Sequence, residues 1–457
     1  MSTSPAVPAP VPTAPGGLPL IGHALRLART PLPFLTSLRE YGGVVRVRLG
    51  PTPAYVVTDP ALTRTVLVTE AASFAKGGKI FDTLRFVFGD GLATIADGDT
   101  HLRNRRLMQP MFNRAHIATR CTAMIEQVRS MTGAWEDGRP RDVFADMNDV
   151  TLAGFLVAVF GTDLPENLRG EFTALMPDIM RETIRQTLLP PWAARLPLPA
   201  HRAYARRVER LRALVDEAVD HHAPTAATGC PHHPGPPAAD GHTGLFRTLM
   251  TGEEPLTRRQ LQDEAITLLN AAIETSGTTL AWALYEITRH PGTEERLRAE
   301  LTAVCGDRPL RPEDLDHLPY ARRVLKEALR KYGPAWIVTR TTTRDVDLGG
   351  HRIPAGADIV WSPYLHQNDP SRFPEPDAFD PDRWTLDRTP TTRDAFFAFG
   401  DGRRKCIGEN FAWVELQIIL ATVLQTWPRL RLVSRPPRPQ TAITVKPDRL
   451  TMVFGTS

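Results

Sequence analysis

The sequence predicts a single, mainly α-helical domain with a small amount of β-sheet. Helical patterns of apolar residues dominate from about residue 60 to 345, whereas strand signals are confined to short stretches near 44–58 and 352–361. No internal repeat or clear linker divides the chain. The hydrophobic fraction of 42% is enough for one sizeable core in a chain of 457 residues.

The N-terminal part begins with a segment of unusual composition. Residues 1–16 are rich in Pro, Ala, Ser and Thr, so we expect a flexible lead-in, followed by one domain over residues 17–457. Val44–Leu49 and Ala54–Thr58 flank a Gly-Pro-Thr-Pro turn, which predicts a β-hairpin.

The clearest helix begins after Thr257. Thr257 and Gln260 have the spacing of a capping box, and the apolar pattern then runs to His290, where Pro291 stops it. At 1.5 Å per residue such a helix spans about 50 Å, enough to cross a whole domain. A helix that is apolar on most sides is usually buried, so polar residues within it need an explanation. Three stand in its middle: Asn270, Glu274 and Thr275.

Cys406 lies in a loop framed by glycines, just before a final helix expected from about Gly408 to Trp427. A thiolate that binds iron needs backbone N–H groups aimed at its sulfur, and a tight turn at Gly402 supplies them. Gly408 lets the backbone come close as the helix starts, and a helix N-terminus favours the anionic sulfur. Arg404 lies within reach of a carboxylate on the rim of a cofactor.

The spacing Phe-x-x-Gly-x-Arg-x-Cys-x-Gly resembles the haem-binding loop of the cytochromes P450. It is carried here by Phe399, Gly402, Arg404, Cys406 and Gly408. The alternative for this pattern alone is a buried cysteine beside a chance glycine turn. A dinucleotide-binding loop is excluded, because no third glycine and no βαβ context follow Gly400-x-Gly402.

Further segments match the same family in the same order. Glu327 and Arg330 resemble its Glu-x-x-Arg helix and Arg383 the downstream third member, which implies a structural charge network rather than a catalytic one. By resemblance, the haem propionates are held by three further residues: His101, Arg105 and Arg340. The alternative for Arg103, Arg105 and Arg106 is a solvated basic face.

The resemblance implies the P450 fold, a triangular prism with a long central helix and a small β lobe. It also implies haem b, with iron axially ligated by Cys406. Glu274 and Thr275 align with the family's oxygen-activating stretch, where an acid and an alcohol deliver protons for O–O cleavage. A bland alternative for Thr275 is a hydroxyl bonded to the carbonyl four residues earlier. Ala272 stands where the family usually has Gly, so we expect a slightly narrowed oxygen groove.

The residues expected to face the substrate are mostly apolar, which fits a hydrocarbon-like ligand held by shape. They are Phe86, Phe88, Met176, Met180, Asn270, Ala271, Trp336, Ile337 and Ile443. Local stretches resemble bacterial oxygenases of the sesquiterpene pentalenene, so a haem-thiolate monooxygenase of a cyclic terpene in bacterial secondary metabolism is the preferred function. Macrolide or other polyketide and steroid hydroxylases stay open, as does a haem-thiolate binding or sensor protein without turnover.

The sequence contains no flavin or ferredoxin motif, so we expect electrons from a ferredoxin and a ferredoxin reductase. A proximal basic surface would bind the acidic ferredoxin. Its candidates are Arg103, Arg106, Arg114, Arg403 and Lys405.

The formal charge of +4 does not suggest nucleic-acid binding. Four scattered cysteines fit a reducing cytoplasm, and no stretch is long and apolar enough to predict a membrane span. We expect a cytoplasmic monomer. The histidines and Cys230 of the Pro-rich stretch 221–233 could be read as a metal site, but the segment lacks a rigid scaffold.

Overall fold

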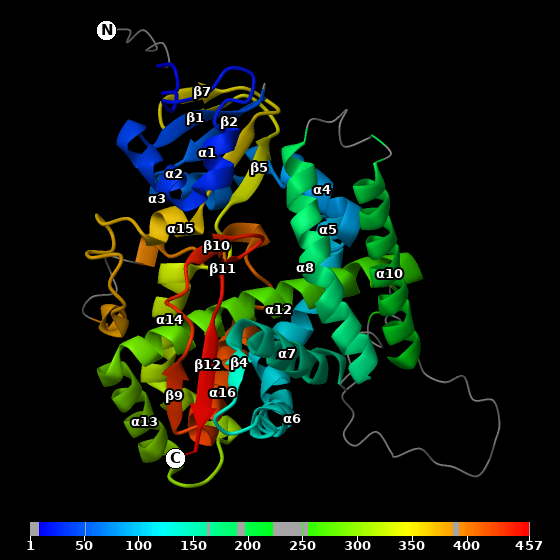
Figure 1. The fold of residues 1–457 in the computed structure, drawn as a ribbon. Helices are drawn as coiled ribbons and strands as arrows, with labels where there is room; N and C mark the ends of the chain where they lie inside the picture. The colour runs from blue at the N-terminus through cyan, green and yellow to red at the C-terminus, as the bar shows by residue number, and fades with distance from the viewer. Residues whose placement is uncertain are drawn as a thin grey trace, which may run out of the picture.

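The computed structural model describes residues 9–50, 52–161, 165–189, 196, 198–222, 249, 255–386 and 393–456. Most helices pack into one large lobe, and the main sheet forms a smaller lobe at the N-terminal end (Figure 1). The helices are α1 Ala24–Arg29, α2 Pro31–Ser37, α3 Pro60–Arg64, α4 Lys79–Phe88, α5 Asp99–Met108, α6 Arg114–Gly133, α7 Val143–Phe155, α8 Glu166–Leu188, α10 Pro199–His222, α12 Arg258–Arg289, α13 Pro291–Cys305, α14 Pro319–Tyr332, α15 Pro363–Gln367 and α16 Glu409–Thr426. The strands are β1 Val44–Leu49, β2 Thr52–Val57, β3 Phe74–Ala75, β4 Pro140–Asp142, β5 Val338–Thr342, β6 Val346–Leu348, β7 His351–Ile353, β8 Asp358–Trp361, β9 Arg429–Leu432, β10 Pro439–Thr441, β11 Val445–Pro447 and β12 Thr451–Gly455.

The main sheet has the strand order β1-β2-β8-β5-β3. The predicted hairpin is confirmed as β1 and β2, with β2 beginning at Thr52 rather than at Ala54. The sheet also holds the end of the Pro-rich lead-in. The backbone N–H of Ala14 donates to the carbonyl of Arg46 at 2.9 Å, and Arg46 donates to Pro12 at 2.7 Å. The expectation of a flexible lead-in is therefore wrong for residues 12–14, because they pair with β1.

The long helix α12 crosses the helical lobe through its centre (Figure 1). Its predicted limits are confirmed: the Thr257–Gln260 capping box is present, and the helix stops ahead of Pro291. It packs closely on α7. A Cβ added to Gly277 would lie 2.0 Å from the side-chain oxygen of Asn148, so the two helices approach to a distance that only glycine permits.

The helix α7 is apolar enough to be mistaken for a membrane span. The 18-residue window Val143–Phe160 has a mean hydropathy of 1.6, although it contains Asp146 and Asp149. Two-thirds of this window (67%) is buried inside the fold, where α7 packs against α12. It is therefore a core helix by its surroundings. The described cysteines Cys121, Cys305 and Cys406 are all free thiols, as the sequence predicts.

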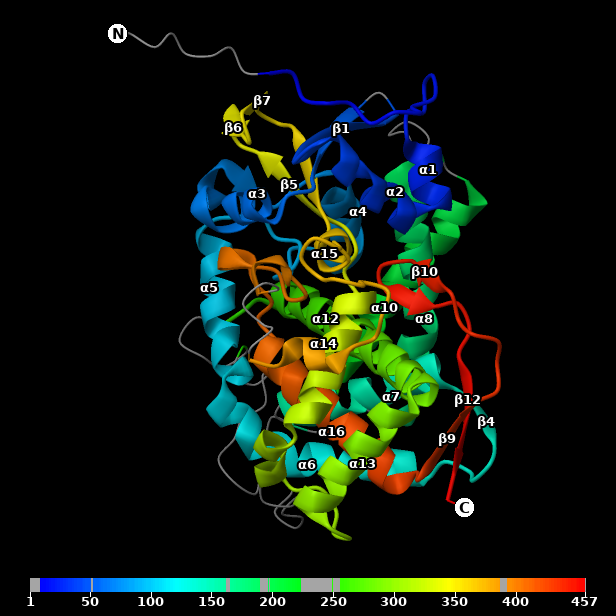
Figure 2. The same cartoon turned by 90° about the vertical axis from the view of Figure 1, so that its left-hand side faces the viewer.

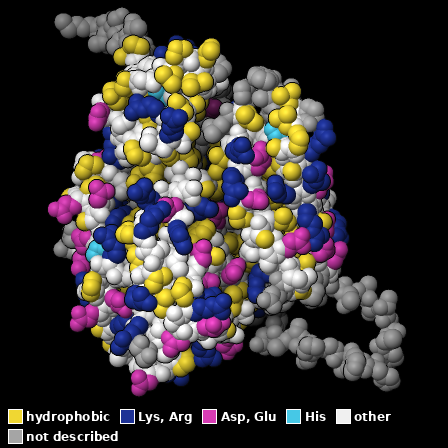
Figure 3. All heavy atoms as spheres, viewed as in Figure 1, with side chains coloured by type: hydrophobic (Ala, Val, Ile, Leu, Met, Phe, Trp, Pro, Cys, Tyr) yellow, Lys and Arg dark blue, Asp and Glu magenta, His cyan; other side chains and the backbone are white. Residues whose placement is uncertain are grey.

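The other elements enclose α12 and α16. The helix α16 lies among α6, α13 and α14, and the small sheet β4-β12-β9 lies at the C-terminal edge (Figure 2). On the face seen in Figure 3, Lys and Arg side chains are interspersed with Asp and Glu. This face has no basic stripe of the kind that nucleic-acid binding requires.

Candidate active site

Cys406 is held in a turn that backbone hydrogen bonds close on both sides. Its N–H donates to the carbonyl of Phe399 at 2.9 Å, and the N–H of Lys405 donates to Gly402 at 3.0 Å. Gly402 has φ +67°, and an added Cβ would lie 2.0 Å from the carbonyl oxygen of Leu67. Both the conformation and the space therefore require glycine there. At Gly408, in contrast, an added Cβ would make only an ordinary contact with Sγ, at 3.9 Å.

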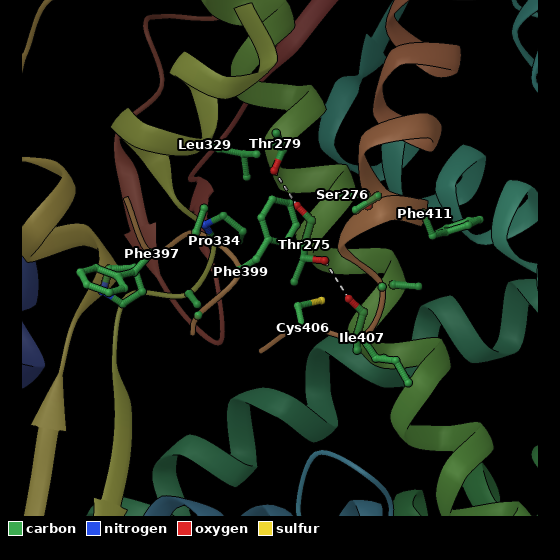
Figure 4. A pocket seen from close by; sticks show the side chains of 18 of the residues that line it. Thr275, Ser276, Thr279, Leu329, Pro334, Phe397, Phe399, Cys406, Ile407 and Phe411 are labelled. Atoms are coloured by element: carbon green, nitrogen blue, oxygen red, sulfur yellow. Dashed lines mark hydrogen bonds between the residues drawn. The ribbon is translucent and has the colours of Figure 1, made fainter. Parts of the chain in front are cut away.

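The Cys406 thiol opens onto an internal cavity whose opposite wall is α12. Thr275 projects from α12 toward the side on which Cys406 lies (Figure 4). The wall is mainly apolar, and Phe399 from the cysteine loop is part of it. Its apolar members include Leu268, Ala271, Ala272, Leu329, Ala335 and Val338.

Opposing effects act on the ionisation of Cys406. Burial and the negative charge of Glu409 raise the pKa of the thiol above its ordinary value, while a hydrogen bond from the backbone N–H of Gly408 and the positive charges of Arg105 and Lys405 offset part of that rise. The groups that favour the thiolate are thus in place. A metal ion held by Cys406 would keep its sulfur in the thiolate form, because a coordinating thiol is deprotonated outright.

Positive charge gathers at one end of the cavity. Lys76, Arg340 and Arg404 all line it, and Arg340 is only 5% exposed. Burial, together with the charges of Arg340 and Arg404, holds the pKa of Lys76 well below its usual range. Burial lowers the pKa of Arg340 to about 10, with Arg404 and Arg403 adding repulsion that Asp97 partly offsets. The single negative charge of Asp97 therefore does not balance the positive charges of Lys76, Arg340 and Arg404.

The other predicted propionate ligands lie close to this cluster. Burial lowers the pKa of His101 to about 4, and the charges of Arg404 and Arg105 add to the effect. Arg404 itself is largely committed to the protein. Its guanidinium donates to Asp97 at 2.8 Å and to the carbonyls of Leu92 and Ile95. A cofactor carboxylate would therefore depend more on Arg340 and Lys76 than on Arg404.

A haem group fits these residues. The protein places a thiol on one wall of the cavity and an excess of buried cations at its end. Buried charges need partners, and two propionates would supply the missing negative charge. Lys76 was not predicted from the sequence, where it is one of only six lysines and follows no recognised motif.

The side chains of Glu274 and Thr275, the acid and the alcohol of α12, make hydrogen bonds to different parts of the protein. The hydroxyl of Thr275 donates to the carbonyl of Ala271 at 2.7 Å, which is the bland helix bond. Its oxygen still has lone pairs that can accept a hydrogen bond from the cavity. The carboxylate of Glu274 instead accepts a hydrogen bond from Thr444 at 2.7 Å, on the side of the β10–β11 hairpin.

A second acid lies deeper in the wall and was also missed from the sequence. Glu415 of α16 lines the cavity and is 1% exposed, and burial raises its pKa to about 8. The nearby Ser276 hydroxyl opposes this shift, although neither carboxyl oxygen has a hydrogen bond of good geometry. The single charged residue in the mostly apolar stretch 411–424 was the available signal.

The predicted charge network is assembled inside the protein. Glu327 and Arg330 are both 0% exposed and are joined by two hydrogen bonds, of 2.8 and 3.0 Å. Arg383 approaches the same carboxylate at 3.4 Å, and the Trp384 indole donates to it at 3.0 Å. The network joins α14 to the loop that precedes the cysteine segment.

The structure brings one predicted substrate contact, Ala271, into the cavity wall. Phe86 is 52% exposed, and its ring lies 5.3 Å from that of Tyr204. Within the described residues, the wall does not include Phe86, Phe88, Met176, Met180, Asn270, Trp336, Ile337 or Ile443. The metal site considered around residues 221–233 falls largely on residues that the structure does not describe, and the described residues contain no other candidate cluster.

Comparison with known proteins places these features in a family context. The family model for cytochrome P450 matches residues 12–453. Cyclooctatin synthase of Streptomyces melanosporofaciens is 38% identical, over 96% of this chain and 94% of its own. Pentalenene oxygenase of Streptomyces avermitilis is 36% identical, over 91% of this chain and 90% of its own. The cyclooctat-9-en-7-ol 5-monooxygenase of S. melanosporofaciens is also 36% identical, over 92% of this chain and 90% of its own. The crystal structure of the cytochrome P450DA heme domain superposes with a TM-score of 0.83 at 24% identity, over 98% of this chain and 97% of that one.

Proposed function

Because the chain belongs to the cytochrome P450 family, we propose that this monooxygenase oxidises a neutral cyclic terpene in bacterial secondary metabolism. One atom of O₂ enters the substrate and the other leaves as water, with two electrons and two protons supplied from outside. The observation that carries the proposal is the apolar cavity between Cys406 and α12. The names of relatives at 36–38% identity, among them pentalenene oxygenase, support a cyclic terpene.

The protein's own residues would bind and orient the cofactor. When bound, haem b supplies the iron at which O₂ is activated. Cys406 would hold that iron from the side of α16. Arg340, Lys76, His101 and Arg105 would hold the propionates, with Arg404 in support. The charge on the propionates would in turn relieve the repulsion among these cations.

Glu274 and Thr275 of α12, the helix that forms the cavity wall facing Cys406, would deliver protons. The hydroxyl of Thr275 donates its proton in a hydrogen bond to the carbonyl of Ala271, so its oxygen is free to accept a hydrogen bond from the cavity. Glu274 is half-buried and would pass protons between solvent and the cavity. A haem-thiolate sensor would need neither group, so the pair favours catalysis.

A substrate titration tests this proposal. A bicyclic or tricyclic sesquiterpene should convert the low-spin haem spectrum to high spin, whereas a macrolide should not. Ala271→Leu, which narrows the cavity, should weaken that response, and Ala299→Leu on the exposed face of α13 is the matched control. A response to the macrolide alone would favour the polyketide alternative.

We also propose that a ferredoxin, reduced by its reductase, delivers the electrons. Arg106, Arg114 and Arg403 are exposed near the cysteine loop. Lys405 is only partly neutralised, because its partner Glu409 at 2.6 Å is itself near Arg322. An acidic partner fits this surface. Arg114→Glu should raise the KM for ferredoxin, most strongly at low salt, and leave substrate binding unchanged; an unaltered KM would place docking elsewhere.

A further inference from the structure

The carboxylate of Glu274 is held by a residue outside its own helix. The hydroxyl of Thr444 donates to Glu274 Oε1 at 2.7 Å. Thr278, one turn further along α12, donates in turn to the hydroxyl oxygen of Thr444 at 3.1 Å. Thr444 and Thr278 are 1% and 0% exposed. Since Thr278 supplies the proton that Thr444 accepts, the hydroxyl of Thr444 is oriented to donate toward the acid.

Thr444 lies in the turn between β10 and β11, which is fixed from two sides. On one side, the indole of Trp282 from α12 donates to the carbonyl of Val445 at 2.7 Å. On the other side, the backbone N–H of Val445 donates to Pro334 at 3.1 Å, and Thr444 bridges Ala335. The position of the Thr444 hydroxyl is therefore set by the packing of this hairpin over α12 (Figure 1).

The same turn adjoins the cavity. Pro334 and Ala335, which pair with it, line the cavity wall. The indole of Trp336 donates to the carbonyl of Ala442 at 2.9 Å, at the other end of the turn. Among the described residues, Thr444 alone donates a hydrogen bond to the Glu274 carboxylate, and no cationic side chain forms an ion pair with it. One hydroxyl thus determines where the acid of α12 points.

We propose that Thr444 is a positioning residue for Glu274. It ties the proton-carrying acid of α12 to the β10–β11 turn, so that the wall of the cavity and the direction of the acid are set together. This inference rests on the proposed function only in assigning Glu274 a role in proton delivery. Thr444 itself is not among the residues that line the cavity.

The test uses the holoenzyme and reads the carboxylate directly. The infrared carboxylate band of Glu274 is identified as the band lost in Glu274→Gln. In Thr444→Val, which keeps the shape but removes the hydroxyl, this band should shift because it loses its donor. Thr444→Ser should restore it, and Thr278→Val, in which Thr444 can still donate to Glu274, should shift the band less than Thr444→Val does.

Product formed per electron supplies the second readout. It should fall about ten- to hundredfold in Thr444→Val, the factor that a lost hydrogen bond to a charged group is worth, and recover in Thr444→Ser. Since Thr444→Val alone would leave the Thr278 hydroxyl without an acceptor, the Thr278→Val/Thr444→Val double variant must show the same shift and the same fall. If Thr444→Val folds poorly, the double variant replaces it in both measurements.

An unshifted band in Thr444→Val, or a Thr444→Ser variant that behaves like Thr444→Val, overturns the proposal. If the band responds as expected but no terpene is oxidised by any variant, the proposed substrate class fails and the positioning role stands. The carbon monoxide spectrum of each variant reports whether the haem and Cys406 are undisturbed.

Discussion

Glu264, near the start of α12, should make the stability of this protein fall as pH rises. Its side chain is 1% exposed and accepts hydrogen bonds from the Leu92 N–H at 2.8 Å and from the Asn104 amide at 2.9 Å. Burial raises its pKa from an ordinary 4.5 to about 7, because the two hydrogen bonds offset only part of the lost hydration.

The sign of the effect follows from that raised pKa. Between pH 4.5 and 7 the folded protein retains a proton on Glu264 that the unfolded chain has already released. Stability is therefore full below about pH 4.5 and is lost progressively up to about pH 7. That interval corresponds to at most about 3 kcal/mol of unfolding free energy.

Urea unfolding between pH 5 and 8, at constant salt, measures this effect. The free energy of unfolding of the native protein minus that of Glu264→Gln should decrease with pH by up to about 3 kcal/mol, since other groups cancel in the difference. Glu295→Gln, at an exposed site on α13, should behave like the native protein throughout. A difference that stays flat or increases from pH 5 to 8 would refute the reasoning.

Three other substitutions have defined outcomes. Cys406→Ser should abolish the red-shifted thiolate band of the reduced carbon monoxide complex, and persistence of that band would exclude Cys406 as the iron ligand. Glu327→Ala leaves Arg330 and Arg383 buried without their carboxylate, at a cost of roughly 3–5 kcal/mol, so the variant should lose haem on gel filtration. A variant that retains haem and loses only turnover would contradict this. Thr275→Ala should bind substrate and consume electrons, but product per electron should fall and peroxide rise about tenfold or more. Unchanged yields would mean that Thr275 serves the helix alone.

The features that sequence could predict are those with local causes. The limits of α12 follow from the Thr257 capping box and from Pro291, both of which act within one turn of the helix end. The turn at Gly402 was predictable because a positive φ favours glycine at that position. The predicted substrate contacts depend instead on how distant segments pack. The cavity wall includes Ala271 but none of the other predicted residues, so their contact with substrate stays a prediction.

The features that were missed arise where distant segments meet. Lys76 becomes part of the cation cluster only when the chain after β3 folds beside Arg340 of β5. Thr444 reaches Glu274 from a hairpin 170 residues away, and nothing in its neighbours indicates that contact. Packing of this kind leaves no periodic or motif signal in a single sequence.

The contact between Gly277 and Asn148 bears on how such an enzyme could acquire a new substrate. Any side chain at Gly277 would force α12 away from α7, and with it the acid and alcohol that lie within one turn. The stretch that we propose handles protons thus has little freedom to vary without loss of activity. Ala271 and Val338 line the cavity without being held in such a contact. Directed evolution toward other terpenes should accordingly find its accepted mutations there, while libraries built around Gly277 return mostly inactive clones.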